Sequence, residues 1–150
     1  MQKIESFKVD HNKIDVGMYI SRIDDNIVTY DVRMVKPNSD RVLTNDGIHT
    51  IEHLFATFAR NTEFSKNIVY VGPMGCLTGF YFITRDLSHN EAIKIVKDSM
   101  NFIADYEGEI PGASKVECGN YKLHSLENAK NDIKLIRQKL QNYSEEQLYY

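Results

Sequence analysis

The residues of this sequence best suited to chemistry form the segment His49-Thr50-Ile51-Glu52-His53. On a helix, His49 and His53 stand one turn apart on one face, where their imidazoles can reach a single metal ion. Glu52 is directed to the histidine side, where a carboxylate can transfer protons without binding the metal. This face is separate from the apolar stripe of the helix, which consists of Ile48, Ile51, Phe55 and Phe58. The alternative is a pair of surface histidines beside a solvated glutamate.

A catalytic metal site needs a third protein ligand, which this helix does not supply. Cys118 lies in a loop next to Gly119, which permits close approach of the backbone, and a thiolate binds divalent transition metals well. Two histidines, one cysteine and a water molecule would leave one position open for substrate. The alternative for Cys118 is a small apolar loop residue. We expect His89 and His124 to lie at the surface or to cap helices rather than to bind metal.

Cys76 lies in the segment Gly72-Pro73-Met74-Gly75-Cys76-Leu77-Thr78-Gly79, which predicts a tight turn between strands with little side-chain cover. A ligand could therefore approach the sulfur, and a nearby cation would favour the thiolate. A thiolate can act as a nucleophile or carry protons. The alternative is a structural cysteine beside a β-turn.

The apolar periodicity predicts the elements that would position these groups. Strands are expected at about residues 16–23, 27–35, 67–71 and 77–84. Helices are expected to begin near Asn45 or Asp46, at the capping box of Ser88 with Glu91, and near Ser125. The N-terminal residues around Ser6 and His11 read as a strand-like stretch with polar residues. This order favours an α+β fold in which an antiparallel β-sheet packs against helices.

Within the strand at 27–35, alternation separates a core face from a polar face. The even-numbered residues from Val28 to Met34 are expected to face the core. Arg33 then lies on the polar face, where a solvated arginine is the ordinary expectation. At the other end of the chain, residues 143–150 are expected to form a polar tail.

Composition limits the classes of protein to which this chain can belong. Its 150 residues are 42% apolar, which suits one buried core and a single domain over residues 1–150. The net charge of −3 argues against nucleic acid as a partner, and no apolar run approaches the ~20 residues of a membrane span. The first residues contain no apolar stretch of signal-peptide length. We therefore expect a cytoplasmic protein whose two cysteines are reduced rather than joined in a disulfide.

Taken together and in order, these segments resemble the S-ribosylhomocysteine lyase family nearly from end to end. The resemblance rests on residues 5–11, Tyr30-Asp31-Val32-Arg33, Pro37-Asn38, residues 49–54, Pro73-Met74-Gly75-Cys76, Ile110-Pro111, Glu117-Cys118-Gly119 and His124-Ser125-Leu126. The pattern H-x-x-E-H alone also occurs in inverted zinc peptidases, but its combination with the two cysteine segments is highly specific.

The resemblance implies a role for each candidate residue. The metal would be bound by His49, His53 and Cys118. It is described for the family as Fe(II), with Zn or Co as substitutes. Two residues would move protons as catalytic acid and base, namely Cys76 and Glu52. Substrate would be bound by Ser6, His11 and Arg33. Since the first two of these are thought to come from the other subunit, the resemblance implies a homodimer with its active site at the interface.

The resemblance also implies a reaction, cleavage of the thioether of S-ribosylhomocysteine to homocysteine and 4,5-dihydroxy-2,3-pentanedione, the precursor of the signal autoinducer-2. Migration of the sugar carbonyl from C1 to C3 makes the C4 proton acidic and places the sulfur β to a carbonyl, which makes elimination feasible. A Lewis-acidic metal ion suits such chemistry. Two residues near the expected pocket depart from the family pattern: Tyr70 replaces a frequent aspartate, and Gly72 replaces a frequent serine.

Two other functions fit the H-x-x-E-H segment. A metallopeptidase would use Glu52 to activate a water molecule, would take a carboxylate or histidine as third ligand and would give Cys76 no role. A non-catalytic, metal-stabilised binding domain would have a closed site of four ligands, with Cys76 as a candidate for the fourth.

Overall fold

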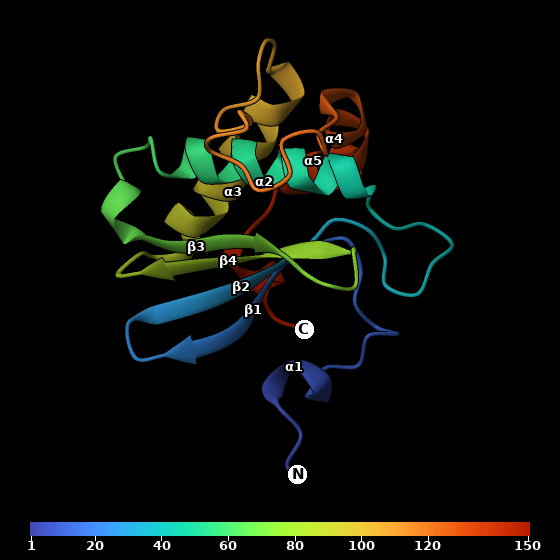
Figure 1. Ribbon diagram of the computed structural model, residues 1–150. Coiled ribbons are helices and arrows are strands. Elements are labelled where there is room, and N and C mark those ends of the chain that lie inside the picture. The colour runs from blue at the N-terminus through green and yellow to red at the C-terminus, as the bar shows by residue number, and fades with distance from the viewer.

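All four strands belong to one antiparallel sheet. The structure is a computed structural model that describes all 150 residues of the chain. The strands are β1 (Gly17–Asp24), β2 (Ile27–Arg33), β3 (Ile68–Pro73) and β4 (Gly79–Arg85). They lie in the order β1-β2-β4-β3, and each neighbouring pair is antiparallel (Figure 1).

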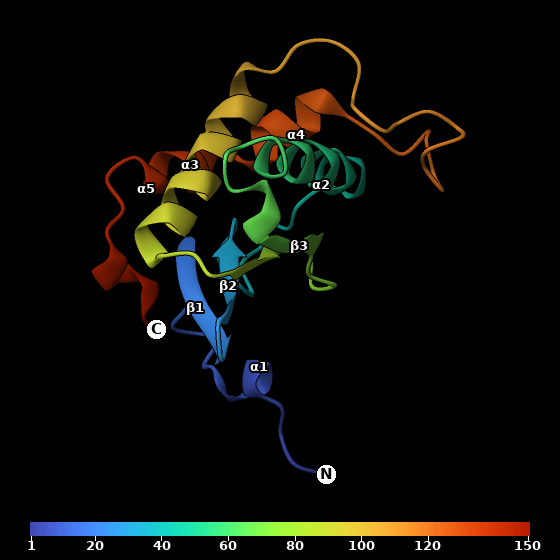
Figure 2. The same ribbon diagram turned by 90° about the vertical axis from the view of Figure 1, so that its left-hand side faces the viewer.

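The longer helices cover one face of this sheet. The helices are α1 (Glu5–Lys8), α2 (Asn45–Ala59), α3 (His89–Asp105), α4 (Leu126–Asp132) and α5 (Lys134–Leu140), with the 3-10 helices η1 (Ser65–Asn67) and η2 (Glu145–Leu148). Figure 1 shows α2 above the sheet and α1 below it, and Figure 2 shows the same separation from the side. We call the face under α2 the inner face and the opposite face the outer face. The expected single-domain α+β fold, an antiparallel sheet packed against helices, is confirmed.

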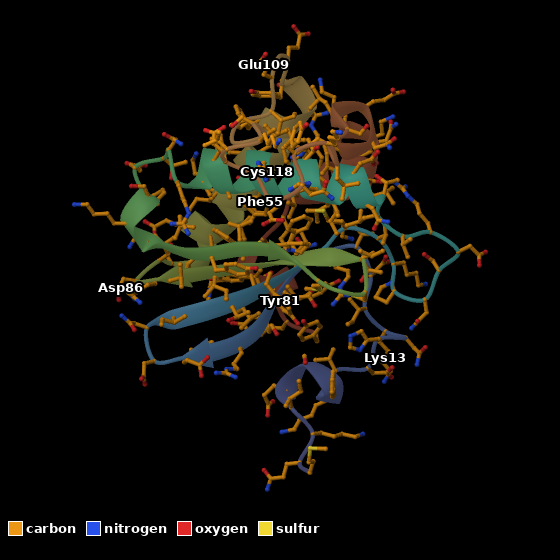
Figure 3. The ribbon with its side chains drawn as sticks, in the orientation of Figure 1. Lys13, Phe55, Tyr81, Asp86, Glu109 and Cys118 are labelled. Atoms are coloured by element: carbon orange, nitrogen blue, oxygen red, sulfur yellow. The ribbon has the colours of Figure 1, made fainter.

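Alternation along β2 and β4 builds the core between the sheet and α2. Tyr30 and Val32 are fully buried on the inner face and lie opposite Phe82 and Phe80 of β4. The ring of Phe55 from α2 packs on this layer, with its centroid 5.5 Å from that of Phe82 and 6.3 Å from that of Phe80 (Figure 3). The predicted core face of this strand is therefore confirmed.

Replacing Phe55 with alanine is expected to destabilise the protein by about 3–5 kcal/mol, because the fully buried ring would leave a cavity between α2 and the sheet. Phe55→Leu retains more of the volume and should cost markedly less. Urea unfolding of both metal-free variants, followed by circular dichroism, measures the difference. An alanine variant as stable as the original protein would contradict this packing.

The start of α2 is fixed by another helix rather than by the residues expected from the sequence. The helix begins at Asn45, as expected, but its N-cap is Thr44 rather than Asn45 or Asp46, and the Thr44 side chain makes no capping bond. Instead, the backbone N–H and hydroxyl of Thr44 donate to Oδ2 of the buried Asp132 at 2.9 and 2.7 Å. A carboxylate at a helix N-terminus is stabilising. Asp132 of α4 therefore holds the end of the helix that carries the two histidines.

Three segments differ from their expected structure. Residues expected to be strand-like form α1, where the side chains of Glu5 and Lys8 pair one turn apart. The single helix expected after Ser125 is divided into α4 and α5, which meet at Ile133, a buried residue with a ψ of −2°. The expected polar tail packs on the domain as η2, with Leu148 fully buried.

The capping box at the start of α3 is as expected. The Ser88 side chain accepts a hydrogen bond from the Glu91 backbone N–H, and the Glu91 side chain accepts one from the Ser88 backbone N–H. Among all the helices, none has the length and apolar character required to cross a membrane.

Candidate active site

Four side chains with metal-binding atoms converge beside α2. Each side chain offers one metal-binding atom, and these four atoms all lie within 4.8 Å of one another. The four residues are His49, His53, Cys118 and His124. Cys118 Sγ lies 3.5 Å from His49 Nε2 and 3.8 Å from His124 Nε2. We call these four residues the metal cluster; Figure 3 shows Cys118 on the α2 side of the sheet. The structure thus brings together the three expected ligands and adds His124, which was expected only at the surface or at a cap.

Hydrogen bonds orient the two histidines of α2 toward the centre of the cluster. His49 Nδ1 lies 2.6 Å from the carbonyl oxygen of Leu123, and His53 Nδ1 lies 2.8 Å from that of Pro111. Because a carbonyl oxygen only accepts, both Nδ1 atoms carry the proton, and both Nε2 atoms keep a lone pair. Contacts of this kind fix the ring orientation of metal-binding histidines.

The donor set fits a divalent transition metal. Neutral imidazoles and a thiolate suit borderline-soft ions such as Fe(II), Co(II) and Zn(II) better than the hard ions Mg²⁺ and Ca²⁺. Burial, together with the neighbouring His49 and His53, lowers the pKa of His124 to about 4. This ring is therefore neutral at neutral pH and adds no positive charge that would oppose a cation.

The loop that carries Cys118 is attached to α2 on both sides of the cluster. Gly112 has a φ of +69° and lies so close that a Cβ there would be 3.3 Å from His53 Nδ1, so glycine permits the approach. At the other end, Thr50 Oγ1 accepts from the backbone N–H of Ser125 at 3.0 Å and lies 3.0 Å from His124 Nδ1. These contacts place the cysteine over the two helix histidines.

Glu52 lies next to the metal cluster, as the helical spacing predicts. It is half-buried and lines a hollow of about 280 Å³ with His53, Ala56, Thr57, Pro111 and Gly112. A molecule in this hollow would contact the carboxylate and the His53 ring together.

A second polar group is centred on Arg33, on the outer face of the sheet. The guanidinium donates from Nε to Asp31 Oδ1 at 3.1 Å and from Nη2 to Asp31 Oδ2 at 2.6 Å. Nη1 donates to Thr78 Oγ1 at 2.7 Å. Arg33 is only 3% exposed, so the expectation of a solvated arginine is wrong. Alternation places it on the outer face correctly, but the carboxylate beside it and the segments above it shield it from solvent.

The expected substrate-binding residues meet at this arginine. A small cavity, which we call the arginine pocket, is lined by Ser6, Val9, His11, Ile14, Ser21, Asp31, Arg33, Tyr81 and Tyr150. The exposed Cys76 adjoins it, since its Sγ lies 3.8 Å from Arg33 Nη1 and 3.0 Å from Thr78 Oγ1. Cys76 thus stands with the substrate-binding residues rather than with the metal cluster.

The metal cluster and the arginine pocket lie on opposite sides of the sheet. In Figure 3, Cys118 is on the α2 side, and Tyr81, which lines the arginine pocket, is on the outer side. Phe55 and the inner-face aromatic residues fill the space between. The eight expected site residues therefore form two groups within one chain. The two cysteines are free.

The two residues that depart from the family pattern are in contact with each other. Tyr70 and Gly72 are two positions apart in β3, and the Tyr70 hydroxyl lies over the Gly72 backbone, in the space that a Cβ would occupy. Glycine at 72 therefore lets the Tyr70 ring lie over the strand, and a side chain at 72 would push this half-exposed ring aside. Both residues share the outer face with Tyr81, which pairs with Gly72.

Sequence reasoning missed three polar neighbours of these groups. Asp31 had a usable signal, because it shares the polar face of β2 with Arg33 two residues away. His124 follows Cys118 by six residues, but only the folded loop shows that both reach α2. Tyr150 had no local signal, because its contact with Asp31 joins residues 119 positions apart.

The fold and the cluster define a single-domain α+β protein with a histidine–cysteine metal-binding site. Comparison with known families then identifies it more closely. The family model described as S-ribosylhomocysteinase (LuxS) matches residues 4–147. The chain belongs to this family.

Relatives in several bacteria are similar over the full length of the chain. A protein named S-ribosylhomocysteine lyase from Phocaeicola vulgatus is 42% identical, with 100% of this chain and 98% of the relative covered. Proteins of the same name from Borreliella burgdorferi and Porphyromonas gingivalis are 44% and 43% identical, with 100% of this chain and 99% of each relative covered. The family resemblance described from the sequence is therefore confirmed.

Proposed function

We propose that this chain is a metal-dependent carbon–sulfur lyase that cleaves S-ribosylhomocysteine to homocysteine and 4,5-dihydroxy-2,3-pentanedione, the autoinducer-2 precursor. The observation that carries the proposal is the convergence of His49, His53 and Cys118 in a chain that belongs to the S-ribosylhomocysteinase family. The names of the full-length relatives support the same reaction. A metallopeptidase is not favoured, because the chain belongs to the S-ribosylhomocysteinase family and because a cysteine, which that alternative does not require, is among the candidate ligands.

The ring geometry supports His49, His53 and Cys118 as the ligands and leaves one position open. Two imidazoles on one tetrahedral metal diverge from it, which puts their centroids roughly 5 Å apart. The centroids of His49 and His53 are 4.8 Å apart at an interplanar angle of 85°. His124 stands at a similar spacing from His53, 4.7 Å and 76°, but it stacks on His49 at 3.9 Å and 23°, which is closer than two ligands of one metal stand. Ring geometry thus excludes His49 and His124 as ligands together, and the family resemblance favours His49. We assign His124 to holding His49 in place, and we propose Fe(II) as the metal, with Zn or Co as substitutes.

The reaction is a series of proton transfers followed by one elimination. Moving a proton from C2 to C1 of the sugar, and then from C3 to C2, carries the carbonyl from C1 to C3. Removal of the C4 proton then breaks the C5–S bond, the sulfur leaves as the thiolate of homocysteine, and the resulting enol becomes the diketone. A bound divalent metal supplies Lewis acidity, which makes the protons beside the sugar carbonyl easier to remove. Atoms balance without water or an oxidant.

Cys76 and Glu52 are the groups that we assign to these transfers. Each is accessible and stands next to one of the two polar groups, with Cys76 at the arginine pocket and Glu52 at the metal cluster. General acid–base catalysis requires that each reach the transferred proton directly or through one water. Ser6, His11 and Arg33, which line the arginine pocket, are assigned to binding the substrate.

A single sugar can contact both groups only if they come from different chains. Within one chain the sheet and its buried aromatic layer separate the metal cluster from the arginine pocket. We therefore propose a homodimer in which the metal cluster and Glu52 of one copy face the arginine pocket and Cys76 of the other. A two-fold dimer would create two such sites. The second copy was expected to contribute Ser6 and His11 to the active site. In the proposed dimer it also contributes Arg33 and Cys76.

The outer face has features that suit such a dimer. Large apolar side chains are exposed on β3, on α1 and at the residue that precedes α1, namely Val69, Tyr70, Phe7 and Ile4. A hollow of about 480 Å³ between α1 and the strands is lined in part by Ile4, Ile27, Val69 and Ile83. Exposed apolar surface of this kind marks interaction sites. Continuity with the arginine pocket, which shares Ser6 and Tyr81 with the hollow, favours a second copy of this chain as the occupant.

Mixing two inactive variants is expected to restore activity. In a dimer of Cys76→Ala with Cys118→Ala, one site keeps an intact metal cluster from the first chain and an intact Cys76 from the second. Random exchange makes about half of the dimers mixed, and each has one working site, so about one quarter of the original activity should return. Thiol release before and after subunit exchange measures this.

The same experiment identifies the opposite arrangement. If both groups of one site came from a single chain, every site in the mixture would lack one cysteine, and activity would stay at the level of the separate variants. Sedimentation of the unmixed protein provides the control for the dimer itself, and a monomer at the assay concentration would contradict the proposed interface.

The lyase assignment is tested by incubating the protein with S-ribosylhomocysteine and titrating the homocysteine thiol that is released. The protein is loaded anaerobically with Fe(II) or Co(II), because both cysteines have to stay reduced. Release that depends on the metal supports the proposal. No release with either metal would overturn it.

A further inference from the structure

The last residue of the sequence lies at the arginine pocket, although nothing in its local pattern suggests a function. Tyr150 Oη donates to Asp31 Oδ2 at 2.8 Å. The same oxygen accepts from Arg33 Nη2 at 2.6 Å. The tyrosine and the arginine thus hold one carboxylate from two sides. Figure 1 shows the C-terminal end of the chain beneath the sheet, on the outer side.

The ring of Tyr150 is fixed as well as its hydroxyl. It stacks on Tyr19 of β1 with centroids 4.8 Å apart and an interplanar angle of 13°. The preceding segment is anchored, since Leu148 is fully buried and the hydroxyl of Tyr143 donates to the carbonyl of Met18 at 2.6 Å. Burial, the charge of Asp31 and the hydrogen bond to it raise the pKa of Tyr150 above its ordinary value, so the hydroxyl remains a donor.

Asp31 connects this tyrosine to the groups that would meet substrate. Both of its oxygens accept from Arg33, and only Nη1 of the guanidinium is directed to the turn that carries Thr78 and Cys76. Two parallel hydrogen bonds join Arg33 and Asp31, so the guanidinium and the carboxylate already share one plane and move together. Tyr150 binds Oδ2 of this pair while its ring stacks on Tyr19, and it thereby fixes the pair relative to β1.

We propose that Tyr150 is a positioning residue of the active site, which holds Asp31 and through it the substrate-binding orientation of Arg33. The inference rests on the proposed role of Arg33 in binding substrate. This role concerns substrate affinity rather than the chemical step. The contacts that position Tyr150 are with Asp31 and Tyr19, not with the metal cluster or Cys76.

The hydroxyl is tested by Tyr150→Phe, which retains the ring and its stacking on Tyr19. We expect KM for S-ribosylhomocysteine to rise about tenfold, which corresponds to about 1.4 kcal/mol, while kcat changes less than about threefold. Tyr149→Phe is the matched control, because Tyr149 is the adjacent tyrosine and is similarly exposed, 63% against 51% for Tyr150, but its hydroxyl does not bind Asp31. This control variant should leave both constants unchanged. Equal unfolding midpoints of the two variants would exclude a loss of folded protein.

Testing Tyr150→Phe in a variant that lacks the Arg33–Asp31 pair shows whether its effect on KM depends on Arg33. Arg33→Met combined with Asp31→Asn removes the ion pair without leaving one buried charge unpaired. In that background, Tyr150→Phe should have no further effect on KM. A tenfold effect that persists there, or the absence of any effect of Tyr150→Phe in the original protein, would overturn the proposal.

Binding to an inactive variant provides a readout that does not need turnover. In the Cys76→Ala background, calorimetric titration with S-ribosylhomocysteine should show the same tenfold weakening for Tyr150→Phe. If the Arg33 variant binds substrate as tightly as the original, the role of Arg33 fails and the positioning role fails with it. If the Arg33 variant binds poorly and Tyr150→Phe binds normally, only the positioning role fails.

Discussion

Replacing Cys76 with alanine is expected to reduce homocysteine release by about 10²–10⁴-fold while the protein retains its metal. A positioned proton-transfer group contributes about this much to a reaction rate. The metal should be retained because the Cys76 thiol contacts Arg33 and Thr78 on the outer face, not the metal cluster. Single-turnover thiol release and elemental analysis of the same sample measure both properties.

Two outcomes would contradict this assignment. Loss of the metal from the Cys76→Ala variant would indicate a closed site in which this cysteine is a ligand. Full activity of the variant would remove it from the chemistry altogether. Thr78→Val is a useful companion variant, because it removes the hydroxyl that lies 3.0 Å from the sulfur but leaves the thiol in place, and we expect a smaller loss.

Replacing Cys118 with alanine is expected to remove the metal and with it all measurable turnover. Two histidines on one helix are left as ligands, and a thiolate is the strongest donor in the set for these ions. Elemental analysis after dialysis measures the loss. The Co(II) form provides a second measurement, since the sulfur-to-cobalt absorption should disappear. The fold should persist, because the Cys118 loop lies outside the buried core of the domain.

His124→Ala distinguishes a neighbour of the metal from a ligand. Because His124 stacks on His49 and bonds to Thr50, we expect its loss to weaken metal affinity by about 10–100-fold, as contacts beyond the ligands typically do. The sulfur-to-cobalt absorption should remain. Complete loss of metal, equal to that of Cys118→Ala, would instead make His124 a fourth ligand and the site a closed one.

Local patterns were sufficient to predict most elements of this chain. The alternation of Tyr30 and Val32 with Asp31 and Arg33 predicts both a strand and its buried face, because side chains in a strand alternate between faces. The spacing of His49 and His53 predicts one helix face in the same way. Such predictions succeed because each depends only on residues within one or two turns of the chain.

The predictions that failed depend on contacts between distant segments. The start of α2 near Asn45 was predicted correctly, but the group that holds it is Asp132, 88 residues away, rather than a local cap at Asn45 or Asp46. Burial of Arg33 requires the segments around Ser6 and Tyr150 to pack over the outer face. Strand alternation alone does not predict that the candidate residues form two groups, the metal cluster and the arginine pocket. That prediction also requires knowing that α2 lies over the inner face of the sheet.

The contact between Tyr70 and Gly72 couples the side chains at these two positions. A Cβ at position 72 would overlap the Tyr70 hydroxyl, so serine there would push the half-exposed tyrosine ring into another rotamer. The effects of substitutions at the two positions should therefore not add. Gly72→Ser should cost more stability beside Tyr70 than beside a shorter residue such as aspartate.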